Sequence, residues 1–227
     1  DIEAAFSQGL PNTPMQHSRI KVVSGNFVTA RPMGIIDGVD YLHTGVVRKV
    51  DAESIQDLLS RGNIVLVSPT GFSPTGEAFN LTTEDVATAI AVAIHADKLI
   101  LSVGVDGVRI QGEKQQDLTA QQAQALIQSK QVDDEDVYNL GYALRAIKGG
   151  VDRVHIVPYA MDGGILTELF THDGVGTMIS TENMESLREA TIDDVAAIVK
   201  LLEPFEAEGI LVKRPREKIE REISHFT

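Results

Sequence analysis

The chain has 227 residues, no cysteine, 33 acidic against 20 basic side chains, and a formal charge of −13. This length accommodates one sizeable α/β domain and part of another. The lack of cysteine excludes disulfides, thiolate zinc sites and a cysteine nucleophile, and the acidic balance argues against nucleic acid as a partner, because gripping a phosphate backbone needs clustered Lys and Arg.

The start of the chain, Asp1-Ile2-Glu3, has neither an initiator Met nor a basic leader segment. No apolar run approaches the roughly 20 residues that cross a bilayer. We therefore expect a fragment of a cytoplasmic protein that has no membrane partner.

The first part of the chain predicts strands and one capped helix. Short β-rich runs at 20–23, 27–30 and 46–50 predict strands joined by hairpins. Asp51 is a suitable N-cap for a helix that ends before Gly62.

The next segment predicts the interior of an α/β sheet. Residues 64–67 show no polar alternation, which predicts a parallel strand covered on both faces. Residues 68–77 predict a loop at the carboxyl end of that strand, where open sheets bind ligands, although no Walker lysine follows. Thr82 and Asp85 predict a capping box that opens a helix.

The β-α-β alternation continues to residue 179. We expect a strand at 98–103, helices at 119–127 and 137–148, and a strand at 153–157. Right-handed crossovers would bring these strands into one parallel sheet. Beyond residue 180 we expect a linker and then a new helical unit with a Thr191/Asp194 capping box and an amphipathic helix at 213–227.

One stretch carries a candidate binding site. Glu168 lies at the end of a short apolar helix, six residues before Gly174 in a glycine-bearing loop. Glycine lets the backbone approach a ligand closely, and a carboxylate with nearby carbonyls suits a guanidinium. The alternative is an ordinary helix, turn and strand, since glycine after a helix is a common C-cap. The histidines have no ligand spacing, so we expect no metal.

Three motifs resemble bacterial N-acetylglutamate synthases: V-V-S-G-N-F at 22–27, T-G-E to F-N-L-T at 75–82, and E-L-F-T to G-V-G-T at 168–177. The resemblance implies an α/β fold, a three-layer αβα amino-acid-kinase-like domain with a mainly parallel sheet, at 1–180. It further implies a linker at 181–186 and the first elements of a GNAT acetyltransferase domain at 187–227, without the glycine-rich acetyl-CoA loop.

The resemblance implies that the whole enzyme transfers acetyl from acetyl-CoA to L-glutamate, the first step of arginine biosynthesis. L-Arginine would be the effector of the kinase-like domain, and family members assemble as homo-oligomers. The catalytic residues would lie beyond Thr227, so the fragment would bind no cofactor and would be inactive alone.

The resemblance also implies the residues of the effector site. Glu168 and the Gly174 carbonyl would hold the guanidinium, with His155 nearby and with Gly176 and Thr177 in the same loop. The spacing of 13 residues between His155 and Glu168 agrees with the family pattern. From the residues alone, a histidine in an apolar strand such as His155 is more often a hydrogen-bonded core residue than a ligand contact, and only the resemblance puts the two readings on an equal footing.

A kinase site would be degenerate. True N-acetylglutamate kinases carry a Gly-Gly-Met-x-x-Lys motif, whereas here Asp134 and Glu135 stand at the glycines and Asn139 at the lysine. Asn80 is retained, but Glu84 replaces the kinase aspartate. Because phosphoryl transfer needs positive charge at the transferring group, this pattern predicts that kinase activity is lost.

Two alternatives remain open. One is an ATP-dependent kinase similar to N-acetylglutamate kinase, and the other is an amino-acid-binding module without catalysis. The missing lysine at Asn139 argues against the first. The additional unit at 187–227 argues against the second.

Overall fold

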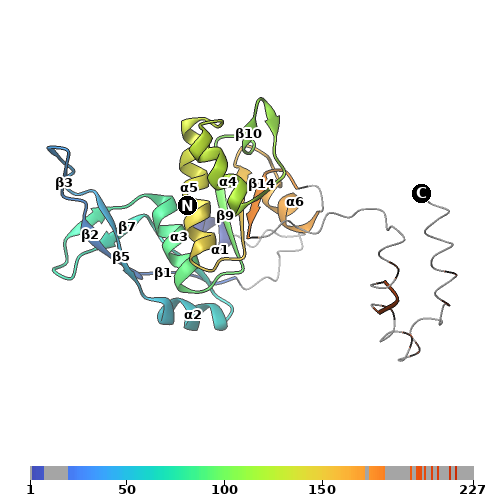
Figure 1. The fold of residues 1–227 in the computed structure, drawn as a ribbon. Helices are drawn as coiled ribbons and strands as arrows, with labels where there is room; N and C mark the ends of the chain where they lie inside the picture. Colours follow the sequence, from blue (N-terminus) through green and yellow to red (C-terminus); the bar gives the residue numbers. More distant parts are fainter. Residues whose placement is uncertain are drawn as a thin grey trace. The chain divides into compact units, whose positions relative to one another are not determined.

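A computed structural model describes residues 2–7, 20–171 and 174–181, together with isolated positions from 195 to 218. The chain divides into two compact units, Asp1–Met184 and Glu185–Thr227. The first unit begins with a short helix, α1 (Ile2–Ser7), and carries all the strands that are described (Figure 1).

One four-stranded sheet has the order β5-β2-β7-β8. Its strands are β2 (Val28–Pro32), β5 (Gly45–Val50), β7 (Thr70–Phe72) and β8 (Ala78–Asn80). The predicted loop at 68–77 is therefore wrong in part, because β7 and β8 form an antiparallel hairpin closed by a bond from the Ser73 amide to the Glu77 carbonyl, at 2.8 Å. A smaller hairpin, β3 (Ile35–Ile36) with β4 (Val39–Asp40), extends from this sheet.

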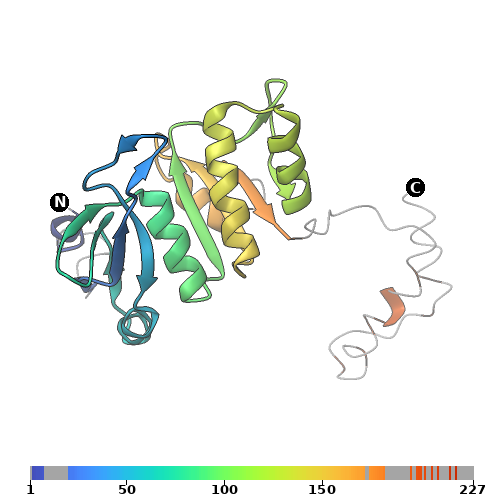
Figure 2. The same cartoon turned by 60° about the vertical axis from the view of Figure 1, so that its left-hand side comes forward.

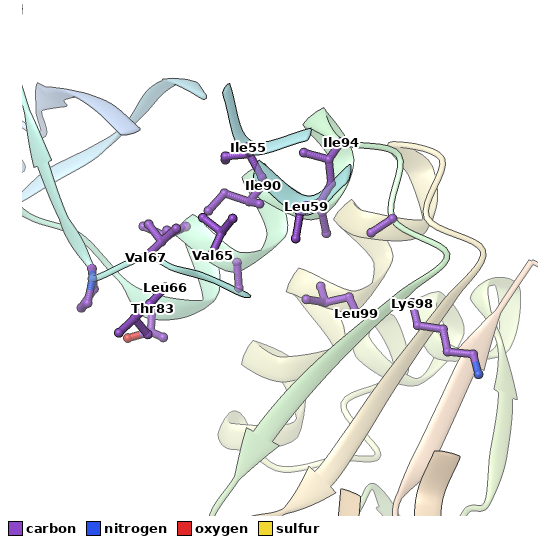
Figure 3. A pocket seen from close by; sticks show the side chains of 15 residues that line it. Ile55, Leu59, Val65, Leu66, Val67, Thr83, Ile90, Ile94, Lys98 and Leu99 are labelled. Carbon is purple, nitrogen blue, oxygen red and sulfur yellow. The ribbon is translucent and has the colours of Figure 1, made fainter. Parts of the chain in front are cut away.

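A parallel pair, β1 (Val22–Ser24) and β6 (Ile64–Leu66), lies beside helix α2 (Ala52–Ser60). The predicted cap is confirmed, because the Asp51 carboxylate accepts a bond from the Ser54 amide. The predicted burial of the strand is wrong, because Ile64 is 37% exposed and the rest of β6 is half-buried. Within the described residues β1 is its one strand partner, and an apolar cavity of about 430 Å³ opens between Val65 and Leu99 (Figure 3).

The second four-stranded sheet has the order β12-β14-β13-β9 and contains the candidate site. Its strands are β9 (Lys98–Val103), β12 (Asp117–Thr119), β13 (Arg153–Pro158) and β14 (Thr177–Ser180). β13 is parallel to β9 and β12 is parallel to β14, but β13 and β14 are antiparallel. The prediction of one parallel sheet is therefore wrong, and the α/β class is confirmed.

The length of the connecting helix accounts for the reversal. Helix α6 (Gly164–Phe170) joins β13 to β14 and has seven residues. Such a helix spans about 10 Å, roughly half the length of a six-residue strand, so it does not carry the chain back to the starting edge. The next strand therefore pairs in the opposite direction.

Helices cover both faces of the second sheet, which gives three layers. Helices α3 (Thr83–Ala93), α4 (Ala120–Ser129) and α5 (Asp134–Lys148) lie on one face, and α6 lies on the other (Figures 1 and 2). The main core forms between them, with Leu140, Ala143 and Ala146 of α5 fully buried against Val154 and Ile156 of β13.

Two helix starts differ from prediction. Thr82 is the N-cap of α3 but makes no capping bond, because Asp85 instead accepts a bond from the Val47 amide and pairs with Arg145 at 2.6 Å. The capping box at Thr82 is therefore wrong. Helix α5 begins at Asp134, three residues earlier than expected, because the Asp133 carboxylate caps the Asp136 amide.

The described positions of the second unit are few. Val195 is fully buried and helical, and residues 198–200 and 202 are also helical. The predicted Thr191/Asp194 capping box lies outside the described residues, as does most of the 213–227 helix. The assignment of 187–227 to an acetyltransferase domain remains a prediction.

Candidate functional site

The candidate site forms where α6 packs against β13. His155 on the strand and Glu168 on the helix face each other, with 2.7 Å between His155 Nδ1 and Glu168 Oε1. Both side chains are buried, at 6% and 5% exposure. The structure therefore brings together the two residues that the spacing of 13 had suggested.

The second oxygen of Glu168 binds the backbone of the glycine loop. Oε2 accepts bonds from the Val175 amide at 2.7 Å and from the Gly176 amide at 2.9 Å. We had expected loop carbonyls here, and these two amides were missed. The signal available was the carboxylate itself, because a buried anion needs hydrogen-bond donors and the backbone N–H groups of a nearby loop can supply them.

Glycine is required at positions 174 and 176, because neighbouring atoms lie too close to leave room for a side chain. Gly174 has φ +55°, and a Cβ on it would lie 2.8 Å from Glu168 Oε2. A Cβ on Gly176 would collide with the Ile156 carbonyl oxygen. Any larger residue would displace the loop from the carboxylate.

Glu168 is a stable anion in this setting. Burial by itself raises the pKa of the carboxyl group, but the bonds from His155, Val175 and Gly176 outweigh it and hold the pKa below the usual value. The site thus carries a buried negative charge that three donors already orient.

In the neutral tautomer that carries its proton on Nδ1, the His155 ring donates to Glu168 Oε1 and leaves a lone pair on Nε2. Nε2 is buried without a hydrogen-bond partner among the described residues. An anion beside an unpaired acceptor suits a ligand that has several N–H donors and a positive charge.

Thr177 holds the glycine loop through two hydrogen bonds of its hydroxyl group. Its hydroxyl donates to the Gln115 carbonyl at 2.6 Å and accepts from the Val108 amide at 2.9 Å. The side chain is fully buried. Of the five predicted site residues, the structure therefore gathers three, His155, Gly174 and Gly176, around the carboxylate of the fourth, Glu168, while Thr177 anchors the loop to residues 108–115.

The predicted degenerate kinase residues are only partly gathered. Glu84 in the first turn of α3 accepts a long bond of 3.4 Å from the Tyr138 hydroxyl, which brings the starts of α3 and α5 side by side. Asn139 follows Tyr138 and is 3% exposed. Within the described residues, no hydrogen bond joins Asn80 to Glu84 or Asn139.

Sequence reasoning missed Asp136, which is buried beside Asn139 on α5. Its Oδ2 accepts a bond from the Arg109 amide at 3.3 Å, and its Oδ1 has no partner among the described residues. Burial raises the pKa of Asp136, the Arg109 bond opposes this, and the charges of Asp133 and Glu135 add to the rise. The start of α5, which would otherwise attract phosphate, therefore carries clustered negative charge.

The described part of the chain offers neither a cluster of metal ligands nor a membrane-spanning helix. No group of three or more His, Asp and Glu side chains is placed to hold a metal ion there. No described helix has both the length and the apolar character needed to span a bilayer.

Sequence relatives cover the whole chain. It is 57% identical over 228 residues to an amino-acid acetyltransferase of Ralstonia nicotianae and 50% identical over 228 residues to one of Pseudomonas fluorescens. These alignments cover 100% of this chain but 51% and 52% of the relatives. The chain thus spans about half the length of the curated relatives it matches, and the resemblance inferred from the motifs is confirmed.

Solved structures agree with this relation. The N-acetylglutamate synthase of Neisseria gonorrhoeae, complexed with coenzyme A and N-acetyl-glutamate, shares 40% identity at a TM-score of 0.70 over 92% of this chain and 49% of that chain. The same enzyme complexed with coenzyme A and L-arginine shares 40% identity at a TM-score of 0.71 over 90% of this chain and 47% of that chain.

A carbamate kinase of Giardia, at 12% identity and a TM-score of 0.53, shares the fold alone. The model of the amino acid kinase family matches residues 2–158, well over half of the chain. The chain therefore belongs to the amino acid kinase family.

Proposed function

We propose that this chain is part of an amino-acid acetyltransferase that transfers acetyl from acetyl-CoA to L-glutamate, and that residues 1–180 form its L-arginine-binding regulatory domain. The identity of 57% to an amino-acid acetyltransferase over the full chain supports the enzyme class. The 40% identity to a synthase complexed with coenzyme A and L-arginine supports the effector.

The observation that carries the regulatory role is the buried Glu168–His155 pair under the glycine loop. A guanidinium presents five N–H donors in a planar fork and keeps its charge at any physiological pH. Glu168 supplies the countercharge, and His155 Nε2 supplies an acceptor that has no partner among the described residues. Burial strengthens this pairing, because the local dielectric is lower than that of water.

The trans geometry of the peptide limits how the ligand approaches. The Gly174 carbonyl and the Val175 N–H belong to one trans peptide group, so they point in opposite directions. Because that N–H points at Glu168 Oε2, the Gly174 carbonyl is directed away from this oxygen. We propose that a guanidinium touching both groups lies alongside the peptide plane and reaches the carboxylate from the Oε1 side, next to His155.

Acetyl transfer itself is proposed to lie outside these 227 residues. Acetyl-CoA would be the co-substrate of the whole enzyme, and the whole enzyme would be a cytoplasmic homo-oligomer. We assign none of its catalytic groups to the kinase-like domain. The start of α5 argues against phosphoryl transfer there, since Asp134, Glu135 and Asp136 would repel ATP and Asn139 supplies no cation.

The rate of acetyl transfer by the complete natural protein, measured with and without L-arginine, tests this function. We expect L-arginine to change the rate of the wild type and of Glu84→Gln alike, and to leave Glu168→Gln unaffected at the same concentration. An arginine response retained by Glu168→Gln would overturn the regulatory role. ATP-dependent phosphorylation of N-acetylglutamate would overturn the loss of kinase activity.

A further inference from the structure

Lys114 contacts the glycine loop from the side opposite Glu168. Its Nζ donates to the Val175 carbonyl at 2.9 Å, and the side chain is half-buried. The two residues are 61 positions apart in the sequence. This contact brings a cation to the loop that the candidate effector site uses.

The geometry places one peptide group between two opposite charges. The Val175 carbonyl and the Gly176 N–H belong to the same trans peptide, so they point in opposite directions. The carbonyl accepts from Lys114 and the N–H donates to Glu168 Oε2 at 2.9 Å. Lys114, the peptide and Glu168 therefore form a continuous row of charge-assisted hydrogen bonds that ends at His155.

Such a row is cooperative. A cation on the carbonyl polarises the peptide and strengthens the bond that its N–H makes at the other end. Both bonds involve an ionised group, and bonds of this kind are about twice as strong as neutral ones. Rotation of the 175–176 peptide would break both bonds at once, so the loop is fixed in the orientation that presents Glu168 to a ligand.

The placement of Lys114 is itself built into the fold. Lys114 ends the hairpin of β10 (Arg109–Ile110) and β11 (Glu113–Lys114), which turns at Gln111 and Gly112, both with positive φ. Gly107, with φ +120°, lets the hairpin approach closely, because a Cβ there would lie 2.8 Å from Thr177 Oγ1 and 3.3 Å from Lys114 Cδ.

The chain after Lys114 is equally fixed. The Gln115 carbonyl accepts from Thr177 Oγ1, and the Gln116 carbonyl accepts from the Met178 amide at 2.8 Å. From there β12 pairs with β14. Lys114 is therefore positioned by the same strands that hold the loop.

We propose that Lys114 is a positioning residue of the effector site, which clamps and polarises the 175–176 peptide so that Glu168 is held ready for a guanidinium. This proposal rests on the proposed arginine site for its ligand but not for the clamp. Loss of Lys114 should weaken L-arginine binding about tenfold, the effect of one charge-assisted hydrogen bond. Lys114→Arg should retain most of the affinity.

The test compares Lys114→Met, Lys114→Arg and a matched control, Lys98→Met, in the complete protein. Lys98 is an exposed lysine on β9. Amide hydrogen exchange without ligand should accelerate at Val175 and Gly176 in Lys114→Met while the Ile156 amide of β13 is unchanged. Lys114→Arg and Lys98→Met should match the wild type.

Calorimetry with L-arginine on the same proteins completes the test. Unchanged exchange at Gly176 in Lys114→Met would overturn the clamp. Faster exchange with unchanged arginine affinity would overturn the positioning role and leave Lys114 as a structural contact. If the wild type bound no arginine, the proposed function would fail, and hydrogen exchange would still decide whether the clamp exists.

Discussion

Two buried carboxylates, Glu168 and Asp136, lie on helices that cover opposite faces of the second sheet, and their environments are opposite. Glu168 on α6 receives hydrogen bonds from His155 and from two backbone amides. Asp136 on α5 receives one, from the Arg109 amide, and has Asp133 and Glu135 as charged neighbours. The pKa of Glu168 is lowered and that of Asp136 is raised.

The comparison shows that burial alone does not make a binding site. The number of donors decides whether a buried carboxylate is a stable anion that can attract a cationic ligand. Glu168 meets that condition. The acidic start of α5 does not, and its excess of negative charge opposes the attraction that a helix N-terminus otherwise has for phosphate.

The largest effect should follow from removing the charge of Glu168. We expect Glu168→Gln to weaken L-arginine binding by about 100-fold, or about 2.7 kcal/mol, because a buried guanidinium would lose its countercharge. Calorimetry on the complete protein measures this. Glu84→Gln, which changes the partly exposed carboxylate near Tyr138, should leave the affinity unchanged, and an equal loss in both variants would erase the distinction between the two regions.

The next effect concerns the close approach of the loop to the carboxylate. Gly174→Ala adds a methyl group 2.8 Å from Glu168 Oε2 at a residue with φ +55°. We expect it to lower the free energy of unfolding by about 2–3 kcal/mol. The matched control is Gly163→Ala, which has φ +69° but nothing within 4 Å of the new Cβ and should cost only about 1 kcal/mol.

Urea unfolding of the 227-residue chain measures both glycine variants. Equal losses for Gly174→Ala and Gly163→Ala would mean that backbone strain alone acts at position 174. The close contact between the new Cβ and Glu168 would then contribute nothing to the loss in free energy of unfolding.

A smaller effect is the pH dependence that Glu168 contributes. Its folded-state pKa lies below the ordinary 4.5, so its contribution to stability is complete above that value and is lost as the pH falls through the folded-state pKa. The stability difference between wild type and Glu168→Gln should therefore be largest at neutral pH and shrink on acidification below 4.5. Urea unfolding at a series of pH values checks this, and a difference that grew in acid would contradict the assignment.

The smallest effect is expected at Asp136 and has the opposite sign. The pKa of Asp136 is raised in the folded state. Its contribution to the free energy of unfolding is therefore fully present below the ordinary pKa of 3.8 and is lost as the pH rises through the folded-state pKa. Asp136→Asn keeps an acceptor for the Arg109 amide and removes the buried charge. We expect a gain of less than about 1 kcal/mol at pH 7. A loss at pH 7 would show that the carboxylate has an ionic partner.

Part of the candidate site was predictable from local signals. The six residues from Glu168 to Gly174 and the cap at Asp51 are short-range patterns that one sequence is enough to find. The α/β class followed from the same kind of pattern. The pairing of His155 with Glu168 was expected from the family resemblance, because the spacing of 13 residues alone does not place the two side chains together.

The remainder depends on tertiary packing that spacing does not encode. The direction of β14 is set by the short α6, and the exposure of β6 is set by which strands lie beside it. Lys114 meets Val175 from 61 residues away. Asp85 does not form its predicted capping box, because its carboxylate accepts hydrogen bonds from the Val47 amide and from Arg145, which lie on other elements.

The central claim is that Glu168 recognises the positive charge of a guanidinium. L-Citrulline has nearly the shape of L-arginine but a neutral ureido group, so calorimetric titration of the complete protein with both ligands isolates that charge. We predict that the wild type binds arginine at least about 100-fold more tightly than citrulline, and that Glu168→Gln removes most of this preference. Equal affinities of the wild type for the two ligands, or an undiminished preference in Glu168→Gln, would contradict the claim.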